Sequence, residues 1–222
     1  MNNPIPKAFE EPYSPILYPI AKKKYLKEPS LKPEDSFLDV LVNRRTYRKF
    51  VRLSEDQLSA ILWHSAKATE LQFQENGFIW SHRPCPSAGG RHPIDLIISQ
   101  PEAINTRKLA LYNPIDHSLN ELTLDTTQCL QFIEHINEVV PIGDATIIWF
   151  IADQFRTESK YINPLSLIWR DAGAFLNSLQ LVCCAFKIAC CPLGSLGEPF
   201  ISDLFGEYTP MPIFGVGGCL VG

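Results

Sequence analysis

The chain has 222 residues, 45% apolar and 20% charged, which suits one domain or one subunit of an oligomer with an ordinary core. Its formal net charge of −4 and pI near 5.7 argue against a general nucleic-acid-binding protein, because such proteins are usually basic. No run of eighteen apolar residues occurs, so a membrane span is not expected.

The first 35 residues contain seven of the eighteen prolines and the run Lys22-Lys23-Lys24. Each proline removes a backbone donor, so this segment has little capacity for regular structure. We expect an extended arm over residues 1–35 that lies across the body or a partner subunit, with a disordered leader as the alternative. The segment lacks the basic start and apolar run of a signal peptide.

The seven cysteines include two adjacent pairs in apolar surroundings, Cys183-Cys184 and Cys190-Cys191. Zinc sites favour separated spacings such as C-x2-C, which the sequence lacks, so no metal site is expected. An odd number of cysteines without a secretion signal favours a cytoplasmic location. The thiols are expected to be buried and to pack as small hydrophobes.

Two helices are expected on either side of a strongly basic stretch, residues 44–50. Ser36 can cap the first helix, and Ser54 with Gln57 has the form of a capping box at the start of the second. The stretch between them holds three arginines and one lysine. Guanidinium groups match phosphate oxygens with a planar fork of donors, so the stretch predicts a phosphate-bearing ligand. A solvated basic face is the alternative.

Residues 81–93 are dense in proline and glycine, which predicts a fixed loop whose glycines allow another group to approach the backbone. We interpret it as a ligand loop, with a plain connector as the alternative. A buried strand is expected next, over residues 94–99, because this run is apolar and rich in β-branched residues.

The remaining elements follow from periodicity and turn residues. A hairpin is expected over 109–122 with its turn at 113–116, then a helix over 126–138 and a central strand over 145–152. The most apolar helix is expected over 172–188 with Asp171 as its cap, buried in the core or in a subunit interface. A glycine-containing loop over 191–199 and a strand over 210–218 complete the chain.

Five features occur in a characteristic order. They are an R-R-[ST]-x-R-x-F box from Arg44, a P-S-A-G-G-x-x-P loop from Pro86, a hairpin from Leu111, a Lys160-Tyr161 pair upstream of an Asp171-Ala172-Gly173 helix, and a Pro-Leu-Gly-Ser loop from Pro192. Together they resemble the FMN-dependent nitroreductase-like superfamily. The similarity extends over residues 36–220 and is closest to the SagB-type branch, the azoline dehydrogenases that aromatise thiazoline and oxazoline rings in modified peptides.

The resemblance implies an α+β fold, with a mixed, mainly antiparallel sheet flanked by helices. It also implies an intertwined, obligate homodimer with two FMN sites at its interface. Residues 36–222 would then be the flavin-binding domain that follows the arm. Azoline dehydrogenases typically work beside a cyclodehydratase, so the resemblance further implies a biosynthetic partner enzyme for a small-molecule or peptide substrate.

The resemblance also implies three groups of cofactor-binding residues. The FMN phosphate and ribityl chain would be held by Arg44, Arg45, Thr46 and Arg48. The isoalloxazine or the ribityl chain would lie against Pro86, Ser87, Ala88 and Gly89. Backbone groups near the N5 edge of the flavin would come from Leu193, Gly194 and Ser195. Many members place a further Arg or Lys near the C-terminus on the phosphate, but this sequence has no basic residue after Lys187, so Arg83 or Arg91 are further candidates.

Lys160 and Tyr161 occupy the place of the Lys-Tyr pair that serves the chemistry of azoline dehydrogenases. Oxidising an azoline removes a proton from carbon and transfers a hydride to flavin N5. A buried lysine with a lowered pKa could act as the base, and a tyrosine hydroxyl could relay or donate a proton. The alternative is a surface lysine beside a packing aromatic. Residues 162–168 depart from the branch, because they are apolar where it usually carries arginines.

Two other functions stay open from the sequence. One is an NAD(P)H-dependent reductase of nitro compounds or quinones, which needs no Lys-Tyr pair. The other is a non-catalytic flavin-binding or scaffold subunit of a biosynthetic complex, which the missing C-terminal basic residue favours.

Overall fold

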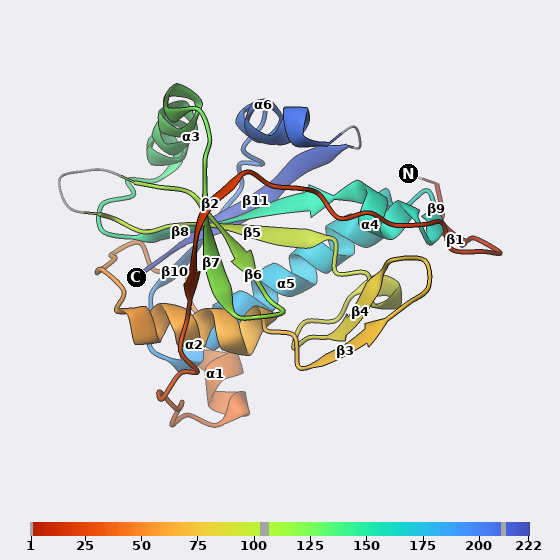
Figure 1. The fold of residues 1–222 in the computed structure, drawn as a ribbon. Helices are drawn as coiled ribbons and strands as arrows, with labels where there is room; N and C mark the ends of the chain where they lie inside the picture. Colours follow the sequence, from red (N-terminus) through yellow and green to blue (C-terminus); the bar gives the residue numbers. More distant parts are fainter. Residues whose placement is uncertain (1, 103–106, 210–211) are drawn as a thin grey trace.

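The computed structural model describes residues 2–102, 107–209 and 212–222, and its centre is one antiparallel sheet of seven strands (Figure 1). The strand order is β10-β11-β8-β5-β6-β7-β2, and each neighbouring pair is antiparallel. The expected α+β class with a mainly antiparallel sheet is confirmed. The strands of this sheet are β2 (Ile20–Tyr25), β5 (Ile94–Ser99), β6 (Ala110–Asn113), β7 (Ser118–Leu122), β8 (Thr146–Asp153), β10 (Cys190–Leu193) and β11 (Ile213–Val221).

Helices cover both faces of the sheet. Helices α2 (Glu55–Ala66) and α5 (Leu165–Ala185) lie on one face, and α3 (Thr126–Val139) and α6 (Phe200–Phe205) lie on the other (Figure 1). Strand β8 shows why: alternate side chains point to opposite faces, and both sets are buried and mainly apolar. Ile148 and Phe150 belong to the core under α2 and α5, whereas Ile147 and Trp149 belong to the core under α3 and α6.

Three expected helices are confirmed, two of them together with their expected caps. Ser36 caps α1 (Phe37–Asn43) by accepting a hydrogen bond from the Asp39 amide. Ser54 and Gln57 form the complete capping box of α2. Helix α3 ends one residue beyond its expected range. Local polar residues that satisfy helix-end donors therefore defined these boundaries in the sequence.

The expected start of α5 is wrong. The helix begins at Leu165 rather than Ala172, and Pro164 is the residue that precedes it. Asp171 is therefore inside the helix, and its carboxylate accepts hydrogen bonds from another segment instead of capping its own helix. The hydrophobic stretch before Asp171 continues the helix because the pre-set φ of Pro164 suits a helix start.

The N-terminal arm lies across the body of its own chain and contains regular structure, contrary to expectation. Strand β2, which includes the three lysines, forms an edge of the sheet next to β7. Strand β1 (Ile5–Pro6) pairs with β9 (Tyr161–Ile162). The stretch from Ile20 to Glu28 has no proline, so its amides are free to join a ladder.

Further elements differ from expectation or had none. Cys190–Leu193 is strand β10 where a loop was expected, and β11 extends to Val221 rather than residue 218. Pro210 and Met211, where that final strand was expected to begin, lie outside the described residues. The hairpin of β3 (Glu70–Phe73) and β4 (Ile79–His82) was not predicted, nor were α4 (Gln154–Glu158) and α6.

The cysteines agree with the packing interpretation. All seven are free thiols, and five of them are buried. Among the described residues, no helix combines the length and the hydrophobicity needed to cross a bilayer.

Candidate functional site

The basic stretch of residues 44–50, here called the basic segment, follows α1 and has no regular secondary structure. It lies along the outer edge of β10, because the Tyr47 amide donates to the Cys190 carbonyl over 3.2 Å. Arg45 Nη1 donates to the carbonyl oxygens of Val42 at 2.9 Å and Arg44 at 2.8 Å. The segment is thereby attached to the sheet edge and to the end of α1.

The cationic side chains of the basic segment have no acidic partner in the described part of the chain: no carboxylate forms an ion pair with Arg44, Arg45, Arg48 or Lys49. Arg45, Thr46, Arg48 and Lys49 line an open pocket of about 660 Å³, to which the end of α5 contributes and in which Asp35 is the acidic wall residue. This excess of unpaired positive charge suits an anionic ligand.

Gly194 and Ser195 follow β10 at the same edge of the sheet. Gly194 is exposed, and a Cβ placed on it would meet no described atom within 4 Å. Ser195 Oγ lies 2.6 Å from His135 Nε2 on α3, and Leu193 is buried. The backbone at Gly194 is therefore open to close approach by another molecule, on the sheet edge that also carries the basic segment.

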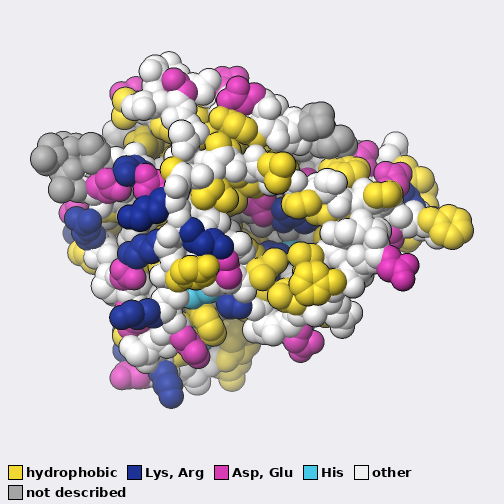
Figure 2. Space-filling view, viewed as in Figure 1, with side chains coloured by type: hydrophobic (Ala, Val, Ile, Leu, Met, Phe, Trp, Pro, Cys, Tyr) yellow, Lys and Arg dark blue, Asp and Glu magenta, His cyan; other side chains and the backbone are white. Residues whose placement is uncertain are grey.

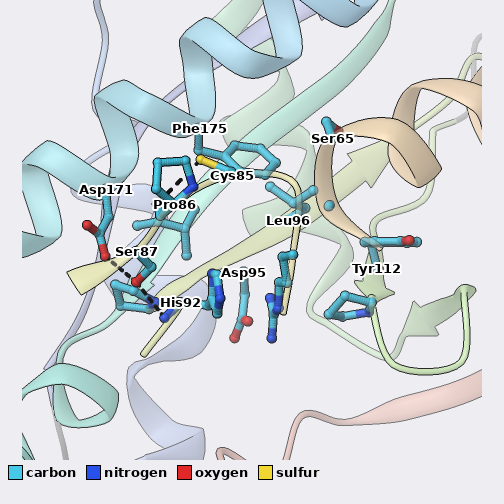
Figure 3. A pocket seen from close by; sticks show the side chains of 15 residues that line it. Ser65, Cys85, Pro86, Ser87, His92, Asp95, Leu96, Tyr112, Asp171 and Phe175 are labelled. Carbon is cyan, nitrogen blue, oxygen red and sulfur yellow. Dashed lines mark hydrogen bonds between the residues drawn. The ribbon is translucent and has the colours of Figure 1, made fainter. Parts of the chain in front are cut away.

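A second group of predicted residues lies in the Ser87 loop, residues 84–93. Ser87 Oγ donates to Asp171 Oδ2 over 2.5 Å, and the Ala88 amide contacts both Asp171 oxygens at 3.2 and 3.3 Å. Figure 3 shows Asp171 directed at Ser87, which in turn accepts from the His92 amide over 2.8 Å. Burial raises the pKa of the Asp171 carboxyl, although the bonds from Ser87 and Ala88 oppose this. The loop is thus tightly fixed to α5.

Lys160 and Tyr161 lie against the Ser87 loop, although more than sixty positions separate them from it in the sequence. A Cβ on Gly89 would lie 2.6 Å from the Tyr161 hydroxyl oxygen and 3.1 Å from Lys160 Cδ. Gly89 also has φ +62°, which other residues rarely adopt. The structure therefore brings Gly89, Lys160 and Tyr161 together.

Glu10 of the N-terminal arm joins this group. Its Oε1 lies 2.7 Å from Lys160 Nζ, and its Oε2 accepts from Arg91 Nη1 over 3.0 Å. Burial favours the neutral acid, but the hydrogen bond from Lys160 and the charge of Arg91 outweigh burial, so the pKa of Glu10 is lowered. The Lys7 amide also donates to the Lys160 carbonyl over 2.9 Å. The arm therefore holds the candidate catalytic lysine from two sides.

Arg91 is committed to the protein interior and is not free to hold a phosphate. It is 1% exposed, and besides Glu10 it donates to Ser159 Oγ and to the Arg156 carbonyl. Its guanidinium carbon lies 3.5 Å from the centre of the Phe78 ring. The expectation that Arg91 supplements the phosphate charge is therefore wrong, because the side chain is buried and already has Glu10 as its counterion.

A family model of the nitroreductase family matches residues 41–217, which is most of the chain. The chain belongs to the nitroreductase family. No curated protein is significantly similar to the sequence. Solved structures nevertheless share the nitroreductase fold.

A candidate nitroreductase of Ralstonia eutropha JMP134 is 20% identical, with a TM-score of 0.61 over 96% of this chain and 97% of that chain. The Escherichia coli microcin synthetase McbBCD complex with truncated pro-MccB17 bound is 12% identical, with a TM-score of 0.56 over 90% and 77%. A candidate nitroreductase from Desulfovibrio desulfuricans, in complex with FMN, is 15% identical, with a TM-score of 0.53 over 85% and 86%. At these identities the likeness shows the fold.

Within this nitroreductase fold the predicted site residues form two separate half-sites at opposite ends of α5. The Ser87 loop, with Lys160 and Tyr161, lies near Asp171, and the basic segment shares its pocket with Cys184 and Lys187. Thirteen helical positions from Asp171 to Cys184 correspond to about 20 Å along the axis. One copy of the chain therefore does not bring the basic segment to the Ser87 loop. The roles of these residues toward a cofactor stay predictions.

Two residues of the half-sites were missed or given another role in the sequence analysis. Glu10 is a single acid in a proline-rich arm, and only the folded arm brings it to Lys160. Asp171 was noticed, but its periodic setting suggested a helix cap rather than an acceptor for the Ser87 loop. Both depend on contacts between segments distant in the sequence, which periodicity does not reveal.

Proposed function

We propose that the protein is an FMN-dependent oxidoreductase that dehydrogenates or oxidises an azoline-like C–N unit in a modified peptide or a related natural product. The observation that carries this proposal is the contact of Lys160 and Tyr161 with Gly89 of the Ser87 loop. Membership of the nitroreductase family supports flavin chemistry, and the FMN complex of the Desulfovibrio neighbour supports FMN as the cofactor. The microcin synthetase likeness supports a natural-product substrate and a biosynthetic partner enzyme.

The residues fit FMN at both half-sites. Arg44, Arg45, Thr46 and Arg48 supply unpaired cations and a hydroxyl for a phosphate and ribityl chain. At the end of β10, Leu193, Gly194 and Ser195 offer backbone groups, and the open position of Gly194 admits a flat ring system. In the Ser87 loop, Pro86, Ser87, Ala88 and Gly89 form a surface held by Asp171. When bound, FMN supplies the hydride acceptor.

A homodimer would complete the site, because the two half-sites lie at opposite ends of α5. A second copy in the reverse orientation would bring its Ser87 loop to the basic segment of the first. Exposed apolar side chains on α1 support such contact: Phe37 is 67% exposed, and Leu38 and Val42 are each 70% exposed. Apolar residues this exposed on one short helix are typical of an interface.

In the proposed mechanism, Lys160 and Tyr161 would handle the protons of the reaction. Lys160 Nζ, as the free amine, would remove the proton from the ring carbon of the substrate. Glu10 Oε1, 2.7 Å away, would pair with the ammonium that forms and hold it in place, and the proton would then leave to solvent at the partly exposed Lys160 side chain. The Tyr161 hydroxyl, next to Gly89, would orient the ring by donating a hydrogen bond to its heteroatom.

One observation favours the NAD(P)H-dependent nitro or quinone reductase as the second candidate. Lys160 forms an ion pair with Glu10 in the structure, and a reductase of this kind needs no free lysine base. A non-catalytic scaffold subunit is the third outcome that an experiment must separate from these two.

The test starts with the visible spectrum of the purified protein before and after anaerobic addition of NADPH. A yellow protein that NADPH does not bleach is expected, and it should convert a thiazoline peptide to the thiazole. Lys160→Gln should lower this turnover about a hundredfold or more with FMN still bound, whereas Lys108→Gln, at a surface ion pair, should not. Bleaching by NADPH without azoline turnover would assign the reductase, and a protein that takes up no FMN would leave the scaffold role.

A further inference from the structure

A groove distinct from the predicted cofactor-binding positions lies under the N-terminal arm. It has a volume of about 350 Å³, and its walls come from the arm, from the β3–β4 hairpin and from the β6–β7 hairpin. Figure 2 shows the hollow, with apolar side chains around it and basic and acidic side chains in its depth. The wall residues include Ile16, Leu17, Phe78, Ile79, Leu111 and Ile115. A volume of this size with mainly apolar walls suits a small organic ligand.

Two of the three arginines of the groove are fully paired. Arg156 binds Asp95 through two parallel bonds, each 2.9 Å long, and it lies 3.4 Å from Asp153. Arg91 is held by Glu10 and by Ser159. These two guanidinium groups therefore have their counterions within the protein and give no reason to expect an anionic ligand.

Arg83 is different, because it has no acidic partner among the residues that the structure describes. Its Nε donates to Ser81 Oγ over 3.0 Å, and no carboxylate forms an ion pair with it. Arg83 lines the groove and also a small cavity of about 30 Å³ behind the Ser87 loop. Burial lowers the pKa of Arg83 to about 10, and the nearby positive charge of Arg156 adds to this effect. A partly buried guanidinium without a counterion is costly unless an anion joins it.

The charges in the groove select the kind of anion. Arg83 contributes one unpaired positive charge, and Asp95 on the same wall contributes a carboxylate that a dianion would meet unfavourably. A monoanionic carboxylate matches one guanidinium with two parallel hydrogen bonds. The apolar walls then provide a surface for a hydrocarbon or aromatic body.

We propose that this groove is a binding site for an organic carboxylate, whose acid group pairs with Arg83 and whose apolar body lies between the arm and the two hairpins. The site does not rest on the flavin assignment, since it shares no residue with the basic segment or with the positions 86–89 of the Ser87 loop.

The test measures binding of 3-phenylpropionate and of its neutral amide, 3-phenylpropionamide, to the full chain with FMN added, by isothermal titration calorimetry. Saturable binding of the carboxylate is expected, with the amide about tenfold weaker or more, because a charge-assisted pair is lost. Arg83→Gln should weaken carboxylate binding by about the same factor, and Arg83→Lys, which keeps the charge, should weaken it less. Equal affinity for acid and amide, no effect of Arg83→Gln, or no saturable binding up to about 10 mM would overturn the site.

A second pair of variants keeps the test decisive if Arg83→Gln does not fold. Ile115 lines the groove and is 39% exposed, so a polar residue there leaves the core intact. Ile115→Glu should weaken binding of 3-phenylpropionate about threefold through repulsion, and Ile115→Gln should leave it nearly unchanged. Identical binding to Ile115→Glu and Ile115→Gln would contradict a carboxylate in this groove.

Discussion

The two ends of helix α5 differ in how firmly the protein itself holds the neighbouring candidate ligand-binding segment. At the Asp171 end, the Ser87 loop is held by the Asp171 carboxylate, by Glu10 of the arm through Arg91, and by its own bond from the His92 amide to Ser87 Oγ. At the Cys184 end, the basic segment has exposed cations, no ion-paired acid among the described residues, and an open pocket. The Asp171 end is held by contacts within the protein, whereas the Cys184 end has unpaired positive charge that an anion could neutralise. Stability and ligand affinity should therefore depend on different ends.

The largest expected effect on folding lies at the organised end. Asp171→Ala removes the acceptor of Ser87 Oγ and of the Ala88 amide, which leaves two partly buried donors unpaired. The loss of unfolding free energy should be about 3 kcal/mol, measured by urea denaturation. Asp203→Ala, at an exposed position of α6, is the matched control and should cost much less. Equal losses in the two variants would show that the Ser87 loop is not organised by Asp171.

The open end should affect ligand affinity without affecting stability. Arg45→Gln combined with Arg48→Gln removes two unpaired charges from the pocket, so FMN affinity should fall about a hundredfold. The measurement is quenching of flavin fluorescence on titration with protein. Lys108→Gln removes a surface charge elsewhere and is the control. A double variant that binds FMN as tightly as the native chain would remove the basic segment from the cofactor site.

Lower pH should weaken the Ser87 loop through His92. Burial, together with the charge of Arg83, lowers the pKa of His92 to about 3, against about 6.5 in the unfolded chain. The unfolded state therefore binds a proton that the folded state does not, and stability is lost as pH falls from about 6.5 toward 3. Between pH 7 and pH 5 this contribution is about 2 kcal/mol.

The His92 effect is measured as the difference between urea unfolding free energies at the two pH values. His92→Asn should reduce this difference by about 2 kcal/mol, since asparagine does not titrate and tolerates the positive φ of +45°. His82→Asn, at an exposed histidine, provides the comparison. The idea fails if both variants keep the native pH dependence.

The smallest expected difference in unfolding free energy between the two ends concerns two glycines. Gly89→Ala would place a Cβ 2.6 Å from the Tyr161 hydroxyl oxygen at a positive φ, and should cost about 1 to 2 kcal/mol of unfolding free energy. Gly194→Ala meets no described atom within 4 Å and should cost less than about 0.5 kcal/mol. Gly194→Ala should weaken FMN binding instead. The measurement is the thermal unfolding of both variants. A larger loss of stability in Gly194→Ala than in Gly89→Ala would contradict the assignment of a rigid end and an open end.

Short-range signals in the sequence predicted much of the fold. The Ser54–Gln57 capping box, the hairpin turn at 113–116 and the mainly apolar strand at 145–152 are each recognisable from neighbouring residues alone. Each is found near its expected position. Strand β10 was missed because Pro192 and Gly194 favour a loop, whereas pairing with β11 overrides that preference at the sheet edge.

The candidate site was predictable in its residue types but not in its arrangement. Arg45 and Gly89 could be selected from the sequence, yet the sequence did not indicate that they lie at opposite ends of one helix. The role of Glu10 depends on the fold of the arm, which brings it to Lys160 over 150 positions along the chain. Contacts between residues so far apart do not appear in the hydrophobic periodicity of the sequence.

Strand β2 has a consequence for how copies of the protein can meet. It forms one edge of the seven-stranded sheet, and all six of its residues are exposed, including Lys22, Lys23 and Lys24. Lysines on an exposed edge are a common protection against strand-to-strand aggregation, and here Lys23 and Lys24 also pair with Asp116 and Glu55 of the same chain. At the other edge, the Tyr47 amide already bonds to the Cys190 carbonyl of β10. Growth of the sheet into an extended fibre is thereby opposed on one side and obstructed on the other, which leaves the helical face as the route to a closed assembly.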